Sequence, residues 1–202
     1  MIKHAKPDHP VNEWIIRRWS PYAFSEKPVA DEHLRSLFEA ARWAASSYNE
    51  QPWRFIIAMK NQPEEYQRML SCLVEPNQAW ARNAPVLVLA TCARKFSHNG
   101  QPNRVAEHDL GLATANIMLE ATARGLAVHA MAGILPDRIR ELYHVPQDVE
   151  IHTAFAIGIA ASPDENPDPN LLERDQAPRD RKPLNEIVFS GQWGKAAAVV
   201  GR

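Results

Sequence analysis

The sequence lacks the short signatures by which many enzymes are recognised. It contains neither the GxGxxG fingerprint of dinucleotide-binding folds nor a Walker A loop, and it contains neither GxSxG nor HExxH. It has eight glycines, and they form no cluster. The eight histidines show no metal-ligand spacing, so no metal site is predicted. If this protein binds a phosphate group, side chains must do much of the work that glycine-rich loops do elsewhere.

A charge excess, a cysteine framework and long apolar runs are also missing. The formal net charge is −1, so neither nucleic acid nor an anionic membrane is indicated as a partner. Cys72 and Cys92 are isolated, which is typical of a reducing compartment. The longest aliphatic run, residues 84–90, is far shorter than the ~20 residues of a membrane span. The opening MIKHAKPDHPVNEW has no apolar core of signal-peptide length, so we expect a soluble, cytoplasmic protein.

Apolar periodicity predicts alternating helices and strands in one domain of typical size. Leu34, Leu37 and Ala41 have helical spacing, and Asp31 stands where an N-cap would begin that helix. Pro76 is expected to end the helix before it. Alternating elements favour an α/β or α+β sandwich. Helices are expected over residues 31–45, 63–75, 104–124 and 136–143, and strands over 53–59, 84–92, 126–134 and 149–160.

The segment 104–124 stands out because residues 110–119 carry no charge. A helix that is apolar all round is predicted to be buried. Gly111, Ala113 and Ala115 are small, so another element is expected to pack closely against this helix. The strand at 84–92 is a continuous apolar run, and we expect both of its faces to be covered.

Three groups of polar residues could bind a ligand. In the first, Arg17, Arg18 and Ser20 place two guanidinium groups and a hydroxyl close together, a combination that suits phosphate oxygens. The alternative is a pair of solvated arginines at a turn. In the third, Arg179 and Arg181 lie beside Lys182, and the alternative is a solvated basic linker.

The second group is the segment ASSYNEQPWRF, where Ser46, Ser47, Asn49 and Gln51 precede an apolar strand. These side chains can donate and accept many hydrogen bonds. The alternative is a capped turn between a helix and a strand, which needs one or two such residues. Four of them within six positions favour the lining of a site for a polar ligand.

Together, these segments resemble the nitroreductase family of flavin enzymes. The likeness covers most of the chain and follows family order. Its five motifs, from first to last, are RWSPYAF, AASSYNEQPWRF, DLGLATANIMLEATARGL, HAMAGI and RDRKPLNEIVFSGQWG. The second motif, which looks like the family's Ser-Ser-x-Asn-x-Gln-Pro-Trp-x-Phe segment, is the most specific.

The resemblance implies a single α+β domain over residues 1–202, with a central mixed sheet flanked by helices. It implies a homodimer that binds FMN at each of two interface sites, and arms over residues 163–202 that the two chains exchange. It also implies NADH or NADPH as the electron donor. The reaction would take place on FMN, so the resemblance implies no catalytic side chain.

The cofactor-binding residues follow from matching the motifs position by position. The resemblance places basic and hydroxyl side chains at the phosphate, the polar segment against the ring and ribityl chain, and the HAMAGI turn along the ring. The set is Arg17, Arg18, Ser20, Ser46, Ser47, Asn49, Gln51, Ala130, Met131, Ala132, Gly133, Arg179 and Arg181. The chain departs from the family pattern at Trp19 and Tyr22, where many members have a basic residue. Asn77 lies in a segment that often approaches the flavin in related proteins.

The function that the resemblance implies is an FMN-dependent oxidoreductase. It would use NAD(P)H to reduce nitroaromatics, quinones or small activated carbonyl or enal compounds by a ping-pong hydride mechanism. One alternative is a flavin-binding storage or sensor protein with little turnover. Another is an enzyme of the same fold that consumes or dehalogenates a specific compound. The residues alone support only a pocket for a phosphorylated polar ligand.

Overall fold

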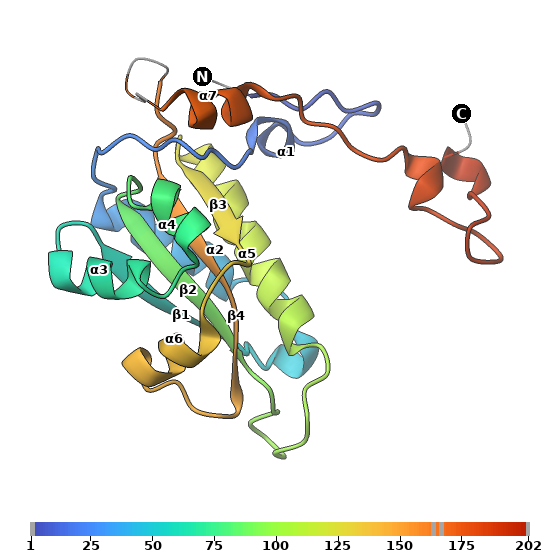
Figure 1. Ribbon diagram of the computed structural model, residues 1–202. Helices are drawn as coiled ribbons and strands as arrows, with labels where there is room; N and C mark the ends of the chain where they lie inside the picture. The colour runs from blue at the N-terminus through green and yellow to red at the C-terminus, as the bar shows by residue number, and fades with distance from the viewer. Residues whose placement is uncertain (1–2, 163–164, 166–167, 201–202) are drawn as a thin grey trace.

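The structure is a computed structural model of the chain, and it describes residues 3–162, 165 and 168–200. A four-stranded sheet forms its centre, and helices cover both faces of the sheet (Figure 1). The prediction of an α+β sandwich is therefore confirmed. The strands are β1 (Trp53–Met59), β2 (Val86–Ala93), β3 (Ala127–Met131) and β4 (Val149–Gly158), in the spatial order β1-β2-β4-β3.

The family resemblance implied a mixed sheet. The described sheet is instead antiparallel, because every pairing of its four strands is antiparallel. β2 and β3 do run in the same direction. The chain passes from β2 through a hairpin-like segment and then through helix α5 (Ala106–Ala123) to reach β3. However, β4 lies between these two strands and runs against both. The strand–helix–strand order along the chain therefore produces no parallel pair, because the last strand separates the two that would form it.

β2 lies between two hydrophobic cores. Besides α5, the helices are α1 (Glu13–Arg17), α2 (Asp31–Arg42), α3 (Pro63–Leu70), α4 (Glu75–Ala81), α6 (Pro136–Tyr143) and α7 (Pro169–Gln176). Leu87 and Leu89 belong to the core under α3, α4 and α6, whereas Val86 and Val88 belong to the core under α2 and α5. Both faces of the strand are thus covered, as the apolar run predicted.

The helix expected over residues 31–45 ends at Arg42, and the one expected over 104–124 spans Ala106–Ala123. Two further differences concern how helices begin. Ala30, not Asp31, occupies the N-cap of α2, and no side chain caps that end. Asp31 lies instead in the first turn, where the positive end of the helix dipole stabilises its negative charge. The helix expected over residues 63–75 is two helices, and Pro76 lies in the first turn of the second, α4. Proline is tolerated there because the first turn has no intrahelical acceptor for its missing N–H.

The apolar helix α5 is buried on one side only. Ala113 and Ile117 are completely buried against the sheet. Leu112 is 37% exposed, and Gly111 and Ala115 are also exposed. The prediction of a helix buried all round is therefore wrong for the single chain. No helix in the described part of the chain is long and apolar enough to cross a membrane.

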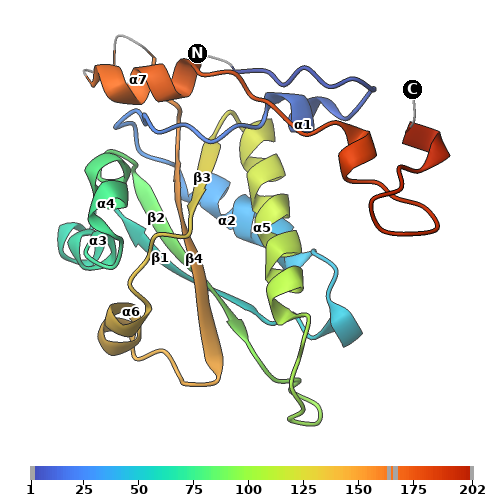
Figure 2. The same cartoon turned by 45° about the vertical axis from the view of Figure 1, so that its right-hand side comes forward.

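The C-terminal segment leaves the body of the molecule after α7. Figures 1 and 2 show α7 lying across the end of the sheet, near α1, and the chain beyond it extending outward. Trp193 on this extension is 91% exposed and Ile187 is 56% exposed. Part of the expected arm, residues 163–164, 166–167 and 201–202, lies outside the described residues.

Candidate functional site

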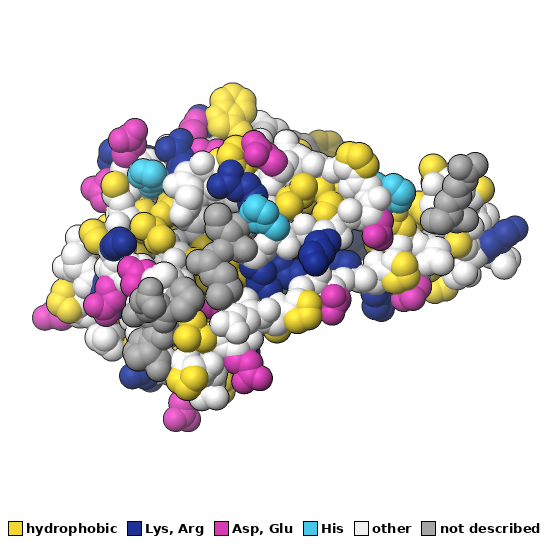
Figure 3. All heavy atoms as spheres, turned by 90° about the horizontal axis from the view of Figure 1, so that it is seen from above, with side chains coloured by type: hydrophobic (Ala, Val, Ile, Leu, Met, Phe, Trp, Pro, Cys, Tyr) yellow, Lys and Arg dark blue, Asp and Glu magenta, His cyan; other side chains and the backbone are white. Residues whose placement is uncertain are grey.

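A cationic pocket lies at the end of the molecule that carries the start of the chain and the residues after α1 and after α7. Its volume is about 180 Å³. Three segments that are distant in sequence converge on it: the start of the chain, the residues after α1 and the residues after α7. Figure 3 looks onto this end, where Lys and Arg side chains gather at the base of the extension. The lining residues are Lys3, Arg18, Trp19, Ser20, Arg179 and Arg181.

Hydrogen bonds hold these cations in place. Arg18 donates from Nη1 to Ser20 Oγ at 3.2 Å. Arg179 donates from one guanidinium nitrogen to the carbonyl oxygens of Lys3 and Ile16, at 2.9 and 3.0 Å. Arg181 donates to the carbonyl oxygen of Asp180. Arg179 thus joins the segment after α7 to the start of the chain and to the last turn of α1.

The pocket concentrates positive charge. Burial lowers the pKa of Arg18, and the nearby guanidinium groups of Arg179 and Arg181 lower it further. The pKa of Arg179 is lowered by burial and by Arg181. None of the ion pairs between described residues involves these three arginines. The three guanidinium groups repel one another, and no carboxylate is paired with them. A phosphate group fits such a site, because the phosphate can supply the missing negative charge and accept the hydrogen bonds of the guanidinium groups.

The structure brings together four of the five predicted phosphate residues: Arg18, Ser20, Arg179 and Arg181. It does not place Arg17 there. The guanidinium carbon of Arg17 lies 5.1 Å from the centroid of the Trp14 ring, and Arg17 does not line the pocket. Lys3 lines the pocket but was not predicted, because a lysine in a polar opening segment carries no local signal of a site.

The polar segment forms a tight, strained loop. Ser47–Asn49 is a 3-10 turn, and Tyr48, Asn49 and Gln51 have positive φ angles of 54°, 54° and 51°. The backbone N–H of Gln51 donates to Ser46 Oγ at 3.0 Å. Residues with side chains rarely adopt this left-handed conformation, so surrounding contacts must hold it.

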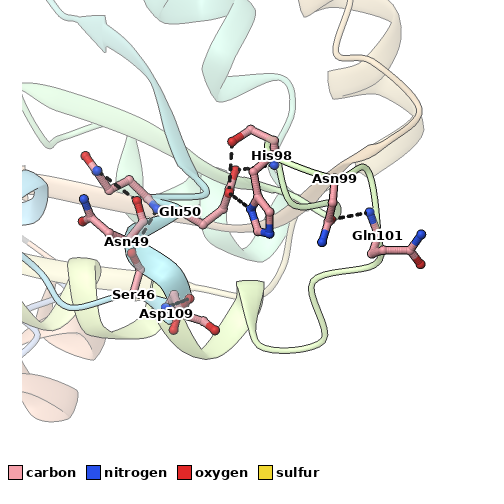
Figure 4. A network of polar contacts seen from close by, with 10 residues as sticks. Ser46, Asn49, Glu50, His98, Asn99, Gln101 and Asp109 are labelled. Atoms are coloured by element: carbon pink, nitrogen blue, oxygen red, sulfur yellow. Dashed lines mark hydrogen bonds and ion pairs between the residues drawn. The ribbon is translucent and has the colours of Figure 1, made fainter.

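Two carboxylates fix this loop, and sequence analysis identified neither. Asp109, in the first turn of α5, is 3% exposed and accepts the backbone N–H of Ser47 at 3.0 Å. Glu50 accepts hydrogen bonds from the backbone N–H and the hydroxyl of Ser97, at 2.9 and 3.1 Å. Figure 4 shows Glu50 reaching toward His98 while Asp109 lies under the other end of the loop. Acidic residues are common in loops and at helix starts, so neither residue stands out in the sequence.

The HAMAGI turn lies at the end of an edge strand. β3 has one neighbour, β4, so the other side of its backbone is not paired within the sheet. Met131 is buried, whereas Ala130 and Ala132 are exposed. A Cβ atom on Gly133 would lie 2.5 Å from Asn77 Nδ2, which donates to the carbonyl oxygen of Gly133 at 3.0 Å. The turn therefore packs tightly on α4 while its outer side stays accessible.

His129 packs against residues 18–23, the segment after α1 that helps to line the pocket and that we call the pocket segment. Its Nδ1 lies 2.8 Å from the carbonyl oxygen of Pro21, and its ring packs against those of Trp80 and Tyr22, with centroid distances of 4.4 and 4.6 Å. Burial is the largest cause of its lowered pKa. These contacts give His129 a structural role in holding the segment that carries Ser20.

The predicted site residues form separate groups within one chain. The polar loop contacts the first turn of α5 through Asp109. The segments that line the cationic pocket, which are the start of the chain and the residues after α1 and after α7, lie beyond the other end of α5 (Figure 2). An 18-residue helix is about 27 Å long, which is close to the diameter of a small domain. The loop and the pocket of one chain are therefore too far apart to bind one mononucleotide.

Solved structures of other proteins have a similar fold. The crystal structure of an oxidoreductase containing FMN has a TM-score of 0.85 and is 36% identical, and the match covers 93% of this chain and 94% of that one. A protein from Desulfovibrio desulfuricans that is provisionally named a nitroreductase, solved in complex with FMN, has a similar fold, with a TM-score of 0.70 and 23% identity over 93% of this chain and 99% of that one.

Sequence comparisons also find similar proteins and a matching family. A protein of Archaeoglobus fulgidus that is provisionally named an NADH dehydrogenase/NAD(P)H nitroreductase is 27% identical over 149 residues, which cover 71% of this chain and 82% of the relative. The sequence model of the Nitroreductase family matches residues 15–159, from the end of α1 to the end of β4. That match spans more than half of the chain and confirms the resemblance: the protein belongs to the nitroreductase family.

Proposed function

We propose that this protein is an FMN-dependent oxidoreductase that uses NADH or NADPH to reduce nitroaromatics, quinones or small activated carbonyl and enal compounds. The observation that carries the proposal is the cationic pocket, in which three arginines surround Ser20 in a chain of the nitroreductase family. The 36% identical oxidoreductase, which contains FMN, supports the same cofactor.

In this proposal, the pocket binds the phosphate of FMN. Arg18, Arg179 and Arg181 supply charge-assisted donors, and Ser20 supplies a hydroxyl. Lys3 adds a further positive charge at the same place. When bound, FMN would take a hydride from NADH or NADPH and then reduce the acceptor, in the order of a ping-pong reaction. The side chains bind and orient the cofactor, and none is assigned as a nucleophile.

The turn at residues 130–133 would lie along the flavin ring and offer backbone groups to it. Its position on an edge strand supports this role, because a neighbouring strand does not cover its outer side. The hydrogen bond between Asn77 and Gly133 would keep the turn in place. His129 is assigned no proton transfer, because its Nδ1 is engaged with Pro21 and its ring is packed between two aromatic rings.

We further propose a homodimer in which each FMN site combines the pocket and turn of one chain with the loop 46–51 of the other. Two features support it. The exposed apolar side of α5, including Leu112 and Ala115, needs a cover. The loop and the pocket of one chain lie at opposite ends of α5, so a single mononucleotide can contact both only where two chains meet. In this proposal the chain forms one domain over residues 1–202, and its arm, residues 163–202, reaches across the partner chain. The dimer would be cytoplasmic.

Complementation tests the shared site. Arg18→Ala damages the pocket, and Asn49→Gly removes the loop amide while glycine tolerates the positive φ. In a heterodimer of the two variants, one site carries both defects and the other carries none. We expect the mixed, refolded chains to recover wild-type affinity for FMN at one site per heterodimer, an affinity that neither variant has alone. If mixing restores nothing although heterodimers form, each site belongs to one chain.

The oxidoreductase activity is tested anaerobically. The purified protein is loaded with FMN, its visible spectrum is recorded, and NADH and NADPH are added separately. Rapid loss of the flavin absorbance with either nucleotide would establish the reductive half-reaction, after which nitroaromatic and quinone acceptors can be compared. A bound flavin that neither nucleotide reduces would refute the proposed activity and favour a storage or sensor protein. Failure to bind FMN would refute the cofactor assignment.

A further inference from the structure

Helix α7 is attached to the pocket segment by a buried carboxylate that has no part in the site described so far. Asp175, near the end of α7, is 5% exposed. Its Oδ1 accepts the backbone N–H of Tyr22 at 2.8 Å, and its Oδ2 accepts the backbone N–H of Ala23 at 3.0 Å. Each oxygen of one side chain thus binds one of two successive N–H groups, about 150 residues away in the sequence.

A second contact joins the same two segments. The guanidinium carbon of Arg174 lies 3.7 Å from the centroid of the Tyr22 ring, and Arg174 donates to the Tyr22 hydroxyl at 2.7 Å. The contact is exposed, and it therefore adds less to the attachment than the buried carboxylate does.

The attachment lies a short distance along the chain from each half of the cationic pocket. On one side, Ala23 follows Ser20 by three residues. On the other side, Arg179 follows Asp175 by four residues, a length that spans at most about 14 Å when extended. Pro178 lies within this short link and fixes its own φ angle. A change at Asp175 therefore moves the arginines after α7 relative to the residues after α1.

Asp175 has no ion-pair partner among the described residues. Burial lowers the pKa of the neighbouring His129, and the charge of Asp175 opposes that effect. The hydrogen bonds that its two oxygens accept come from the two backbone N–H groups. A negative charge near an anion pocket weakens phosphate binding, since like charges repel. Because an apolar side chain would leave both N–H groups without an acceptor, the carboxylate matters for geometry.

We propose that Asp175 is a positioning residue, which sets Arg179 and Arg181 against Arg18 and Ser20 so that all four can bind one phosphate group. The inference rests on the proposed FMN function. It adds that α7, the first helix of the arm, is a working part of the phosphate site and not only a connection to the arm. It also predicts that the effect of Asp175 is specific to the phosphate end of the cofactor.

Asp175→Asn is the decisive variant, because asparagine has a single acceptor oxygen and leaves one of the two N–H groups unpaired. Glu173→Gln is the matched control, since Glu173 is an exposed acid on the same helix. The apo forms of the full-length wild type and both variants are titrated with FMN and with riboflavin, which is FMN without its phosphate. Quenching of flavin fluorescence gives the dissociation constants, and thermal unfolding checks that the variants fold.

For Asp175→Asn we expect the Kd for FMN to rise by about tenfold or more, while the Kd for riboflavin stays at the wild-type value. Glu173→Gln should change neither. Equal losses for both flavins would show a general structural role and overturn the inference, and so would no change for either. Tighter FMN binding would mean that Asp175 acts only by charge. If the wild type does not bind FMN more tightly than riboflavin, the pocket does not bind the phosphate. That result would refute the proposed function itself, whatever the effect of Asp175→Asn.

Discussion

Arg18→Ala tests the phosphate pocket most directly. Arg18 is half-buried beside Ser20; burial lowers its pKa, and the two other guanidinium groups lower it further. In the proposed complex, its side chain makes a charge-assisted hydrogen bond that contributes about 1.5–3 kcal/mol. Loss of that bond corresponds to a rise of about 10- to 150-fold in the Kd for FMN. Arg17→Ala is the matched control, because Arg17 precedes Arg18 but lies on Trp14, outside the pocket.

Thermal unfolding at a fixed FMN concentration gives the assay. A ligand at 1,000 times its Kd stabilises the folded state by about 4.1 kcal/mol. If the Kd rises a hundredfold, the same concentration is about ten times the new Kd, and the stabilisation falls to about 1.4 kcal/mol. The shift in Tm on adding FMN should therefore shrink for Arg18→Ala and stay unchanged for Arg17→Ala. Added salt should weaken FMN binding less in Arg18→Ala than in the wild type, because one charge contact is missing.

Two results would refute this reasoning. The first is an Arg18→Ala protein whose FMN-induced shift in Tm equals that of the wild type, which would mean that the pocket does not bind the phosphate. The second is an equal loss in Arg17→Ala, which would mean that general positive charge at this end of the molecule, rather than the geometry of the pocket, accounts for binding.

Two further predictions concern the neighbouring elements. Gly133→Ala should destabilise the fold by about 1–3 kcal/mol, measured by urea unfolding, because the new Cβ would lie 2.5 Å from Asn77 Nδ2 and 2.7 Å from a Val74 methyl group; unchanged stability would show that the turn can shift. His129 has a lowered pKa when folded, so the unfolded chain binds more protons between the folded pKa and the ordinary value near 6.5. Stability should therefore fall as the pH decreases below about 6.5, and this decrease should be smaller in His129→Gln; equal slopes for the two proteins would show that His129 is not its source.

The sequence was sufficient to predict the arginines of the pocket but not their neighbours. Guanidinium groups beside a hydroxyl suit a phosphate but also a solvated turn, and the resemblance to the nitroreductase family linked Arg18 and Ser20 to Arg179 and Arg181. The residues that hold them, Asp175 above all, act through backbone N–H groups far away in the sequence. An acid near the end of a polar helix carries no sign of that partner, because the fold alone decides which N–H group it meets.

The fold shows the same division between local and long-range information. Periodicity placed the strands and most helices, because burial of alternate or every third or fourth residue is a local property. Periodicity could not show that β4 lies between β2 and β3, since strand order depends on contacts across the chain. It also could not show that one side of α5 is exposed. An apolar helix has the same composition whether its second side faces its own core or another chain.

The two halves of the proposed site are held in different ways, and this bears on how a cofactor would bind. The loop keeps three positive φ angles at non-glycine residues, which cost about 1–3 kcal/mol each. Asp109 and Glu50 offset part of this cost with hydrogen bonds made inside one chain. The loop is therefore shaped before a partner or a flavin arrives. The pocket, in contrast, depends on α7, whose attachment through Asp175 joins segments from opposite ends of the chain. A cofactor would meet a loop that is already ordered, and its phosphate would complete the half in which clustered guanidinium groups repel one another.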